Sequence, residues 1–350
     1  MLVSDFDFDL PADQIAQTPS PRGLSRLLVV HRSSGTWEEA TIRDLPSHPR
    51  GGDVVVANDT RVYPARLIGR RDPSGGRVEC LLLERDSDSE WSALVHPGQK
   101  LKAGARMVFE DPARAPGVRI DAEVLARRFF GRRVVRLTVS GAASIDEAVD
   151  AMGHIPLPPY ITRPDEAADR ERYQTVFARN RGSVAAPTAG LHFDAELIRA
   201  IRARGAAWTT VTLHVGYGTF KPVRTERVED HTVDAERFSL SPATADAIQS
   251  AHAAGGRVIA VGTTTTRALE SAASGPGLVT PTSGTANLFI HPGYQFRVVD
   301  GLLTNFHLPR SSLLMLVCAF AGTDLTLAAY RHAVASGFRF YSYGDAMLIL

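Results

Sequence analysis

Four segments of the chain end an apolar run with side chains suited to acid–base chemistry or to anion binding. Three of them carry a histidine, the usual general acid or base near neutral pH. These are His192 in APTAGLHF, His214 in LHVGYGTF and His307 in LLTNFHLP. The fourth, VGTTTTRALES, carries Thr263 to Thr266 and Arg267. Residues so far apart in sequence can act together only if the fold brings them to one place.

The VGTTTTRALES segment follows the apolar run RVIAV and has the pattern of a strand, a Gly-Thr turn and a helix. Free backbone N–H groups and hydroxyls at such a helix N-terminus favour an anion. The segment lacks the lysine of a P-loop and the glycines of a dinucleotide fingerprint, so a carboxylate fits better. Thr263, Thr264 and Arg267 would hold it, and Glu270 would accept hydrogen bonds from ribose hydroxyls. The alternative is an ordinary, well-capped helix.

Two further segments have a composition that suits a ligand. In HVGYGTFKPV, Gly216 allows close approach of the backbone, and Tyr217 and Phe220 offer flat surfaces for a nucleobase. A glycine pair also makes ordinary turns. The run 58–61, Asn-Asp-Thr-Arg, ends an apolar strand in the same way as Asn305 does, although such residues are also common turn formers.

The segments that carry these residues have an α/β pattern. Asp194, Ser241 and Ser311 are each placed to cap a helix, and apolar strands alternate with those helices. The runs 208–215, 257–261 and 298–303 are expected strands, and FRFYSY at 338–343 is expected as the last. Strands that alternate with helices pair in parallel, and their carboxyl ends then meet at one edge, where ligands bind. The histidine and threonine segments are therefore expected to share a cleft.

Between Val62 and about Ser140 the pattern changes to short runs of alternating polarity separated by Gly/Pro turns. Such runs are typical of a small antiparallel barrel or sandwich. We predict an α/β fold with a mostly parallel sheet, formed by residues 1–61 and 152–350, and an inserted β-barrel domain at 62–151. The proline-rich run 156–164 is expected to form an extended connector between them.

Composition sets the outer limits. The chain has 350 residues, 44% of them apolar, and its longest apolar segment, Leu313 to Phe320, is too short to span a membrane. No signal peptide is recognisable at the start, so a cytoplasmic protein is expected. Residues 61–137 hold 16 Arg or Lys against 10 Asp or Glu, which indicates either a polyanion partner or a solvated basic sheet face. Cys80 and Cys318 each lie in an apolar run, as buried cysteines do.

Motifs for other chemistries are missing from the sequence. It contains no HExxH, CxxC or GxSxG, which argues against metal catalysis and against a serine nucleophile. The residues themselves indicate an acid–base enzyme with a pocket for an anion and a nucleoside between two domains.

Several longer motifs resemble one family. NDTRVYPARL, GHIPLPPYI, RYQTVFA, AAPTAGLHF, TLHVGYGTFKPVR, FIHPGYQFRVVD and LTNFHLPRSSLLMLV are similar to the S-adenosylmethionine:tRNA ribosyltransferase-isomerases of queuosine biosynthesis. The resemblance implies transfer and isomerisation of the ribosyl group of S-adenosylmethionine onto 7-aminomethyl-7-deazaguanine at the tRNA wobble position. Epoxyqueuosine-tRNA, adenine and methionine would be the products. It further implies a monomer that needs no metal or cofactor and binds the tRNA anticodon stem-loop.

On this resemblance, acid–base work falls to His192 and His214, with His307 as a further candidate. Asp59 and Arg61 would order the ribose or the base. The other residues that we expect at the substrates form two sets. The S-adenosylmethionine set is Thr188, Gly190, Gly216, Tyr217, Phe220, Thr263, Thr264, Arg267, Glu270 and Asn305, and the tRNA set is Arg66, Arg163 and Lys221.

The sequence departs from the family pattern at two places. Where the family has Met-His-x-Glu, residues 233–236 are Val-Asp-Ala-Glu, and the family's Thr-Asp and Tyr are replaced at 286, 287 and 291 by Ala, Asn and His. These changes keep two alternatives open. One is a paralogue that uses S-adenosylmethionine on a small-molecule amine, and the other is a non-catalytic RNA-binding protein.

Overall fold

The computed structural model describes the backbone of residues 1–350 and every side chain except those of Phe130 and Phe220. Its larger part is a nine-stranded mixed sheet. In spatial order the strands are β17 (Thr282–Ala286), β13 (Glu236–Leu240), β12 (Ala207–Leu213), β3 (Val54–Asn58), β14 (Val258–Val261), β18 (Gly301–Asn305), β19 (Ala346–Ile349), β1 (Arg26–His31) and β2 (Thr36–Thr41). The four strands from β12 to β18 are parallel to one another, as are β19 and β1, and the other neighbours pair antiparallel.

Helices cover both faces of this sheet because its central strands are apolar on both sides. Along β3, Val54 and Val56 face the core shared with four helices, α4 (Pro242–Ala253), α5 (Thr263–Ser271), α6 (Ser312–Ala321) and α7 (Thr323–Ala335). Val55 and Ala57 face the opposite core, formed with α3 (Ala195–Ala203) and a 3₁₀ turn at Ile42–Ser47. The predicted caps are confirmed, since the side chains of Asp194, Ser241 and Ser311 accept hydrogen bonds from the first turns of α3, α4 and α6.

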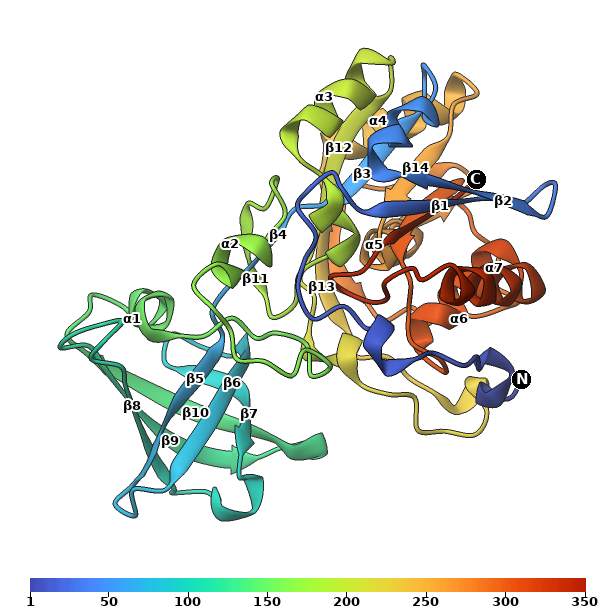
Figure 1. Ribbon diagram of the computed structural model, residues 1–350. Helices are drawn as coiled ribbons and strands as arrows, with labels where there is room; N and C mark the ends of the chain where they lie inside the picture. The colour runs from blue at the N-terminus through green and yellow to red at the C-terminus, as the bar shows by residue number, and fades with distance from the viewer.

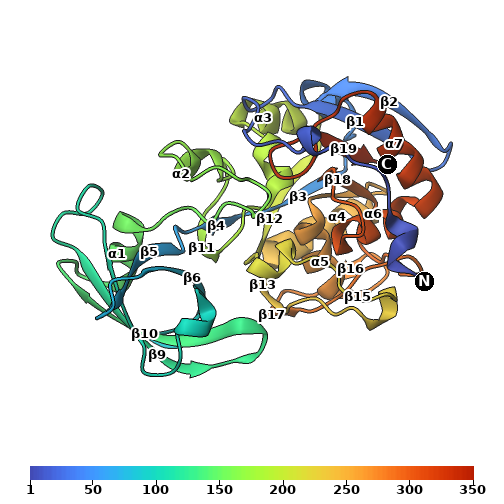
Figure 2. The same cartoon turned by 60° about the horizontal axis from the view of Figure 1, so that its bottom comes forward.

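The second part is a closed antiparallel barrel, seen as a ring in Figure 2. Its strands, in spatial order, are β10 (Arg132–Ser140), β7 (Glu90–His96), β6 (Arg77–Arg85), β5 (Arg66–Asp72), β8 (Arg106–Glu110) and β9 (Arg119–Arg127). Helix α1 (Ile145–Met152) packs its apolar face on the barrel core. The predicted fold class, an α/β domain with a small barrel, is therefore confirmed. The division of the chain at 62 and 151 stays a prediction.

Short elements connect the two parts. β4 (Thr60–Val62) pairs in parallel with β11 (Asn180–Ser183), and both lie between the sheet and the barrel in Figure 1. The short helix α2 (Asp169–Arg172) lies beside them, and the expected extended run 156–164 contains no helix. A two-stranded hairpin, β15 (Ala273–Gly275) with β16 (Leu278–Val279), follows α5.

One predicted strand is wrong. Residues 338–343 form no strand, since Phe340 makes only an isolated parallel bridge with Ile15, and the last strand is β19 at Ala346–Ile349, antiparallel to β18. The segment is apolar because Phe338 and Phe340 pack against Phe306 in the core. Burial with a single isolated bridge, in place of a strand, produced the same apolar pattern that a strand would have.

No single helix in the described part of the chain is long and apolar enough to cross a membrane. By length and composition alone, α6 and α7 taken together meet that requirement, but they meet at an angle of 116°.

Candidate active site

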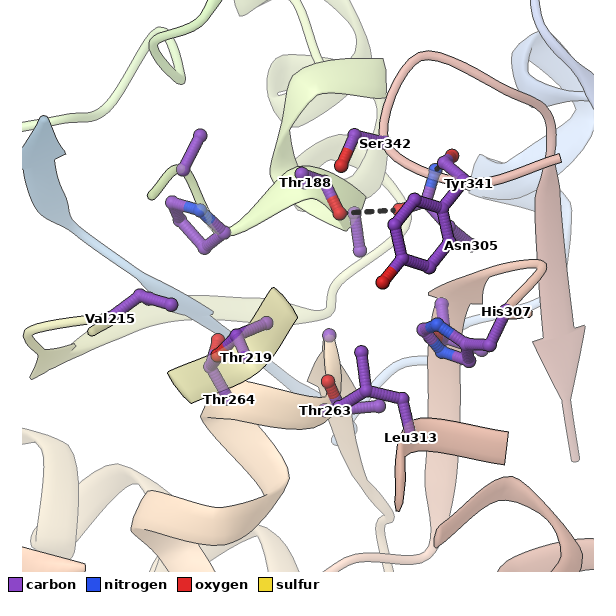
Figure 3. Close-up of a pocket in the computed structure, with 15 residues that line it drawn as sticks. Thr188, Val215, Thr219, Thr263, Thr264, Asn305, His307, Leu313, Tyr341 and Ser342 are labelled. Atoms are coloured by element: carbon purple, nitrogen blue, oxygen red, sulfur yellow. Dashed lines mark hydrogen bonds between the residues drawn. The ribbon is translucent and has the colours of Figure 1, made fainter. Parts of the chain in front are cut away.

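The carboxyl ends of β12, β14 and β18 open onto a hollow of about 480 Å³, part of it open to solvent, which we call the sheet-edge pocket (Figure 3). It is built from segments that are far apart in the sequence, as the parallel strand order requires. Polar side chains on its wall include Thr188, Thr263, Thr264, Asn305, His307 and Tyr341. The predicted convergence of the 188–192, 263–267 and 305–307 segments is thus observed.

Two more hollows adjoin this pocket. The ion-pair groove lies beside Asp234, Glu236 and Arg267 and shares Thr219 and Leu313 with the sheet-edge pocket. The His214 groove contains His214, Gly216 and Tyr217 and shares Val215 with the sheet-edge pocket.

A fourth hollow adjoins the His214 groove on the side of the barrel. The barrel groove, between barrel residues such as Arg66 and the proline-rich connector, shares Tyr217 with the His214 groove. The four hollows together form a path of adjoining spaces from the sheet edge to the barrel.

His192 lies behind the sheet-edge pocket and is not on its wall. Its ring is buried, with Nδ1 2.8 Å from Oγ of Ser25 and Nε2 3.1 Å from Nδ2 of Asn305. Since an amide nitrogen only donates, Nε2 accepts and the proton of the neutral ring is on Nδ1. Burial, with the nearby Arg22 and Arg339, lowers the pKa of His192 to about 4. This geometry suits a residue that orients Asn305 better than one that exchanges protons with a substrate.

His307 does line the sheet-edge pocket. Its Nε2 lies 2.9 Å from Oγ1 of Thr304, and burial lowers its pKa to about 3. The ring is therefore neutral at physiological pH.

His214 occupies the neighbouring groove and is only half-buried. Its Nδ1 lies 2.9 Å from Oγ1 of Thr60, and no described side chain bonds its Nε2. Burial and the Arg237 guanidinium lower its pKa, against the opposing effect of Asp59. A neutral imidazole with one nitrogen held and the other facing a groove has the arrangement of a general base.

Helix α5 presents its N-terminus to the sheet-edge pocket. Gly262, with φ of 92°, makes the turn from β14, and Thr263 and Thr264 line the pocket from the first turn. The backbone N–H groups at such an end bind carboxylates well. The hydroxyls of Thr265 and Thr266 instead bond back to the carbonyls of Val261 and Gly262.

The structure does not support a carboxylate-binding role for Arg267. The guanidinium is buried and pairs with Glu236, and it also donates to the carbonyls of Leu288 and Ala286. Burial raises the pKa of Glu236, and Arg267 opposes that effect. The same carboxylate accepts the N–H of Gly216 at 2.8 Å, so the pair fixes the backbone between two grooves.

Glu270 also lies away from the pocket in which it was expected to bind a ribose. Its carboxylate is buried and accepts from Tyr294, 3.0 Å away, and from the backbone N–H groups of Arg297, Val298 and Val299. These four bonds hold the loop before β18, and Glu270 does not contact the described hollows. Its assignment to ribose stays a prediction that this position does not favour.

Asp59 and Arg61 also lie away from the expected position beside a ribose or a base. Asp59 is buried and accepts from Thr210, Thr212 and Asn180 at 2.7 to 3.0 Å, which ties β12 to the linking strands. Arg61 is exposed on β4 and outside the described hollows. Neither is placed to order a ribose or a base in this structure.

Some of the remaining predicted substrate residues line a hollow, and others do not. Thr188 lies in the sheet-edge pocket and donates to Oδ1 of Asn305 at 3.1 Å (Figure 3). Gly190 is a packing position, because a Cβ there would lie 2.7 Å from the side chain of Thr175. Gly216 and Tyr217 line the His214 groove. The side chain of Phe220 lies outside the described residues.

Of the three residues expected at tRNA, two lie along the path of hollows or at its border. Arg66 lines the barrel groove and pairs with Glu79, and Lys221 pairs with Asp234 at 2.7 Å. Arg163 is instead bound through both nitrogens to buried Asp169, which makes it a structural residue of the connector. Its assignment to tRNA stays a prediction.

Among the residues of the sheet-edge pocket that sequence reasoning missed are Tyr341 and Ser342. Both fall in the segment that was expected to be a strand. The signal that could have found them is Gly344, which marks a turn three residues after Tyr341. Among the described residues, no group of three or more His, Cys, Asp or Glu side chains could hold a metal ion.

Comparisons with known proteins agree with this description. Residues 3–349 match a family model described as "Queuosine biosynthesis protein". The chain is 47% identical to an S-adenosylmethionine:tRNA ribosyltransferase-isomerase from Desulfitobacterium hafniense, over 100% of both chains. It is 52% identical to one from Acidithiobacillus ferrooxidans, over 100% of this chain and 98% of that one.

A solved structure is also similar. The crystal structure of S-adenosylmethionine tRNA ribosyltransferase from Thermotoga maritima matches 99% of this chain and 100% of its own. The TM-score is 0.55 and the sequences are 35% identical.

Proposed function

Because the chain belongs to the queuosine biosynthesis protein family, we propose that it is an S-adenosylmethionine:tRNA ribosyltransferase-isomerase. In this reaction the aminomethyl nitrogen of 7-aminomethyl-7-deazaguanine bonds to the ribosyl group of S-adenosylmethionine. The bonds from that group to sulfur and to adenine break, and methionine, adenine and epoxyqueuosine-tRNA leave. The observation that carries the proposal is the match of named relatives along the whole chain.

The geometry supports this reaction with three kinds of group. The N-terminus of α5, with Thr263 and Thr264, suits the methionine carboxylate. His214 is placed to accept a proton, and His307 is a second neutral imidazole in the adjoining pocket. A neutral imidazole suits a reaction in which a proton is removed beside the sulfonium, and the imidazolium that forms can return that proton as adenine departs.

The acceptor is proposed to be the tRNA anticodon stem-loop. The path of hollows leads from the sheet edge to the barrel, where Arg66 lines the groove. Stacking surfaces and cations are the features that single-stranded RNA needs, and Tyr217 lies where the two grooves meet. We further propose a cytoplasmic monomer that uses no metal or other cofactor and consumes S-adenosylmethionine as a substrate.

The test is a turnover assay with S-adenosylmethionine labelled in its ribose. With tRNA that carries the aminomethyl-deazaguanine, we expect adenine release together with transfer of label into RNA. The matched control is the same tRNA with guanine at the wobble position, which should give neither. Adenine release with a small amine and not with tRNA would favour the paralogue. RNA binding with no release would favour a binding protein.

A further inference from the structure

Tyr341 has an unusual backbone. Its φ is 75°, and Arg310 is the only other non-glycine residue with a positive φ among the described residues. The left-handed region is unfavourable for a residue with a side chain, because the Cβ atom comes too close to the backbone. Such strain persists where the surroundings hold it, and it is found most often at functional sites.

The surroundings of Tyr341 hold its backbone at both ends. Its N–H donates to the carbonyl of Phe306 at 3.0 Å, and its own carbonyl accepts from Nδ2 of Asn305 at 3.1 Å and from the N–H of Gly344 at 3.0 Å. Asn305 is the last residue of β18 and Phe306 follows it, so the end of this strand holds the conformation of the loop.

Asn305 is in turn fixed by two neighbours. Its Nδ2 also donates to Nε2 of His192, and its Oδ1 accepts from Thr188. His192 is fixed by Ser25. A continuous chain of hydrogen bonds therefore runs from Ser25 through His192 and Asn305 to the carbonyl of Tyr341.

The side chain of Tyr341 points into the sheet-edge pocket. Figure 3 shows its hydroxyl directed to the middle of the space between Thr263 and His307. The residue is 7% exposed, and its ring packs edge-on against Tyr160 with 3.9 Å between centroids. No described residue bonds the hydroxyl, whereas the buried hydroxyls of Tyr63 and Tyr343 donate to Leu82 and Asp169.

We propose that Tyr341 is a substrate-contacting residue whose hydroxyl donates a hydrogen bond to the nucleoside part of S-adenosylmethionine, and that Asn305 and His192 are its positioning residues. This inference rests on the proposed function. Burial holds the pKa of Tyr341 above its usual value, so the hydroxyl keeps its proton throughout the neutral range. The role of His192 is thus to fix the geometry of the pocket through Asn305.

The first test is Tyr341→Phe, which removes the hydroxyl and keeps the ring. We expect kcat/KM for S-adenosylmethionine to fall about tenfold, the loss typical of one hydrogen bond, with an unchanged Tm. Tyr63→Phe is the matched control, since it removes a buried hydroxyl bonded to Leu82 in the barrel. That variant should lower Tm and keep the rate.

The second test separates positioning from simple structural damage. Asn305→Ala should lower kcat/KM at least as far as Tyr341→Phe does. In the Asn305→Ala background, adding Tyr341→Phe should cost less than twofold, because the hydroxyl is already misplaced. Full and independent losses in the double variant would contradict the positioning role.

Two results would overturn the inference at different levels. An active wild-type enzyme with Tyr341→Phe unchanged in both kcat and KM would refute the contact with substrate. A wild-type protein that neither binds S-adenosylmethionine in calorimetry nor releases adenine would refute the proposed function on which the inference rests.

Discussion

Oγ1 of Thr60 lies 2.9 Å from Nδ1 of His214, and this contact leaves Nε2 as the nitrogen that faces the groove. Thr60 is fully buried and also lies 2.7 Å from Oγ of Ser183, which accepts the N–H of Val215. The imidazole is therefore oriented from the linking strands β4 and β11, which join the sheet to the barrel. Residues at the junction of the two parts of the molecule therefore orient His214, a candidate catalytic residue.

Replacing His214 by alanine should reduce kcat for adenine release about 100-fold or more, the usual contribution of a general base. Thr60→Val keeps the imidazole and loses only its orientation, so we expect a loss of about tenfold. If the two act as one unit, the double variant is no slower than His214→Ala. If the double variant instead loses kcat by the product of the two single losses, measured at saturating substrates, the two residues act separately.

Stability should fall as the pH is lowered from 7 to 5. His192 and His307, with pKa values of about 4 and about 3 in the folded state, stay neutral, whereas in the unfolded chain they take up protons near pH 6.5. Below that pH the unfolded state binds more protons, so stability is present above about pH 6.5 and is lost on acidification, by about 2 kcal/mol per histidine down to pH 5.

Thermal unfolding at a series of pH values checks this prediction. His307→Gln removes one of the two groups, so its Tm should fall less steeply between pH 7 and 5 than that of the wild type. Equal slopes for the two proteins would mean that His307 takes up protons in the folded state.

The buried pair of Glu236 and Arg267 should be a major contribution to stability. Glu236→Gln leaves the guanidinium without its counter-charge, and we expect a loss of about 3 to 5 kcal/mol and a clear decrease in Tm. The double variant Glu236→Gln with Arg267→Met removes both charges and should recover part of that loss. A Tm of Glu236→Gln equal to that of the wild type would contradict the prediction.

Asp234 should limit the affinity for RNA. Its carboxylate lies 2.8 Å from Arg132 of the barrel and 2.7 Å from Lys221, so it neutralises two cations beside the path of hollows. Asp234→Asn removes this negative charge, so we expect tighter tRNA binding at low salt. The logarithm of the binding constant should also fall more steeply with the logarithm of the salt concentration, by the amount that corresponds to about one to two more phosphate contacts.

Fluorescence anisotropy with labelled tRNA at several salt concentrations measures both effects. The matched control is Asp246→Asn, the same change on an exposed residue of α4. The prediction is wrong if the two variants have the same salt dependence.

Much of the fold followed from local patterns. Ser241 before Pro242, Ser311 before an apolar run and Asp194 before Ala195 each predicted a helix start, because a cap bonds to backbone only three residues away. The alternation of strands and helices predicted parallel pairing, and parallel pairing places strand ends at one edge. The sheet-edge pocket could therefore be expected before its geometry was known.

Three charged residues that were assigned to substrates already have partners within the protein. Arg267, Glu270 and Arg163 were assigned to substrates because charged side chains near strand ends suggest ligands. Their partners are Glu236, the 297–299 backbone and Asp169, and those pairings depend on contacts that the local sequence does not reveal.

The sequence by itself determined most of the segments that are strands and helices, where most of them begin, and that a barrel is inserted in an α/β chain. These properties depend on residues within a few positions of one another. Only the tertiary structure decided that His192 is buried behind Asn305, that Tyr341 enters the pocket in a left-handed conformation, and which charges are already paired. Each of these depends on hydrogen bonds and packing between residues that are distant in the chain, and such contacts exist only once the sheet has formed.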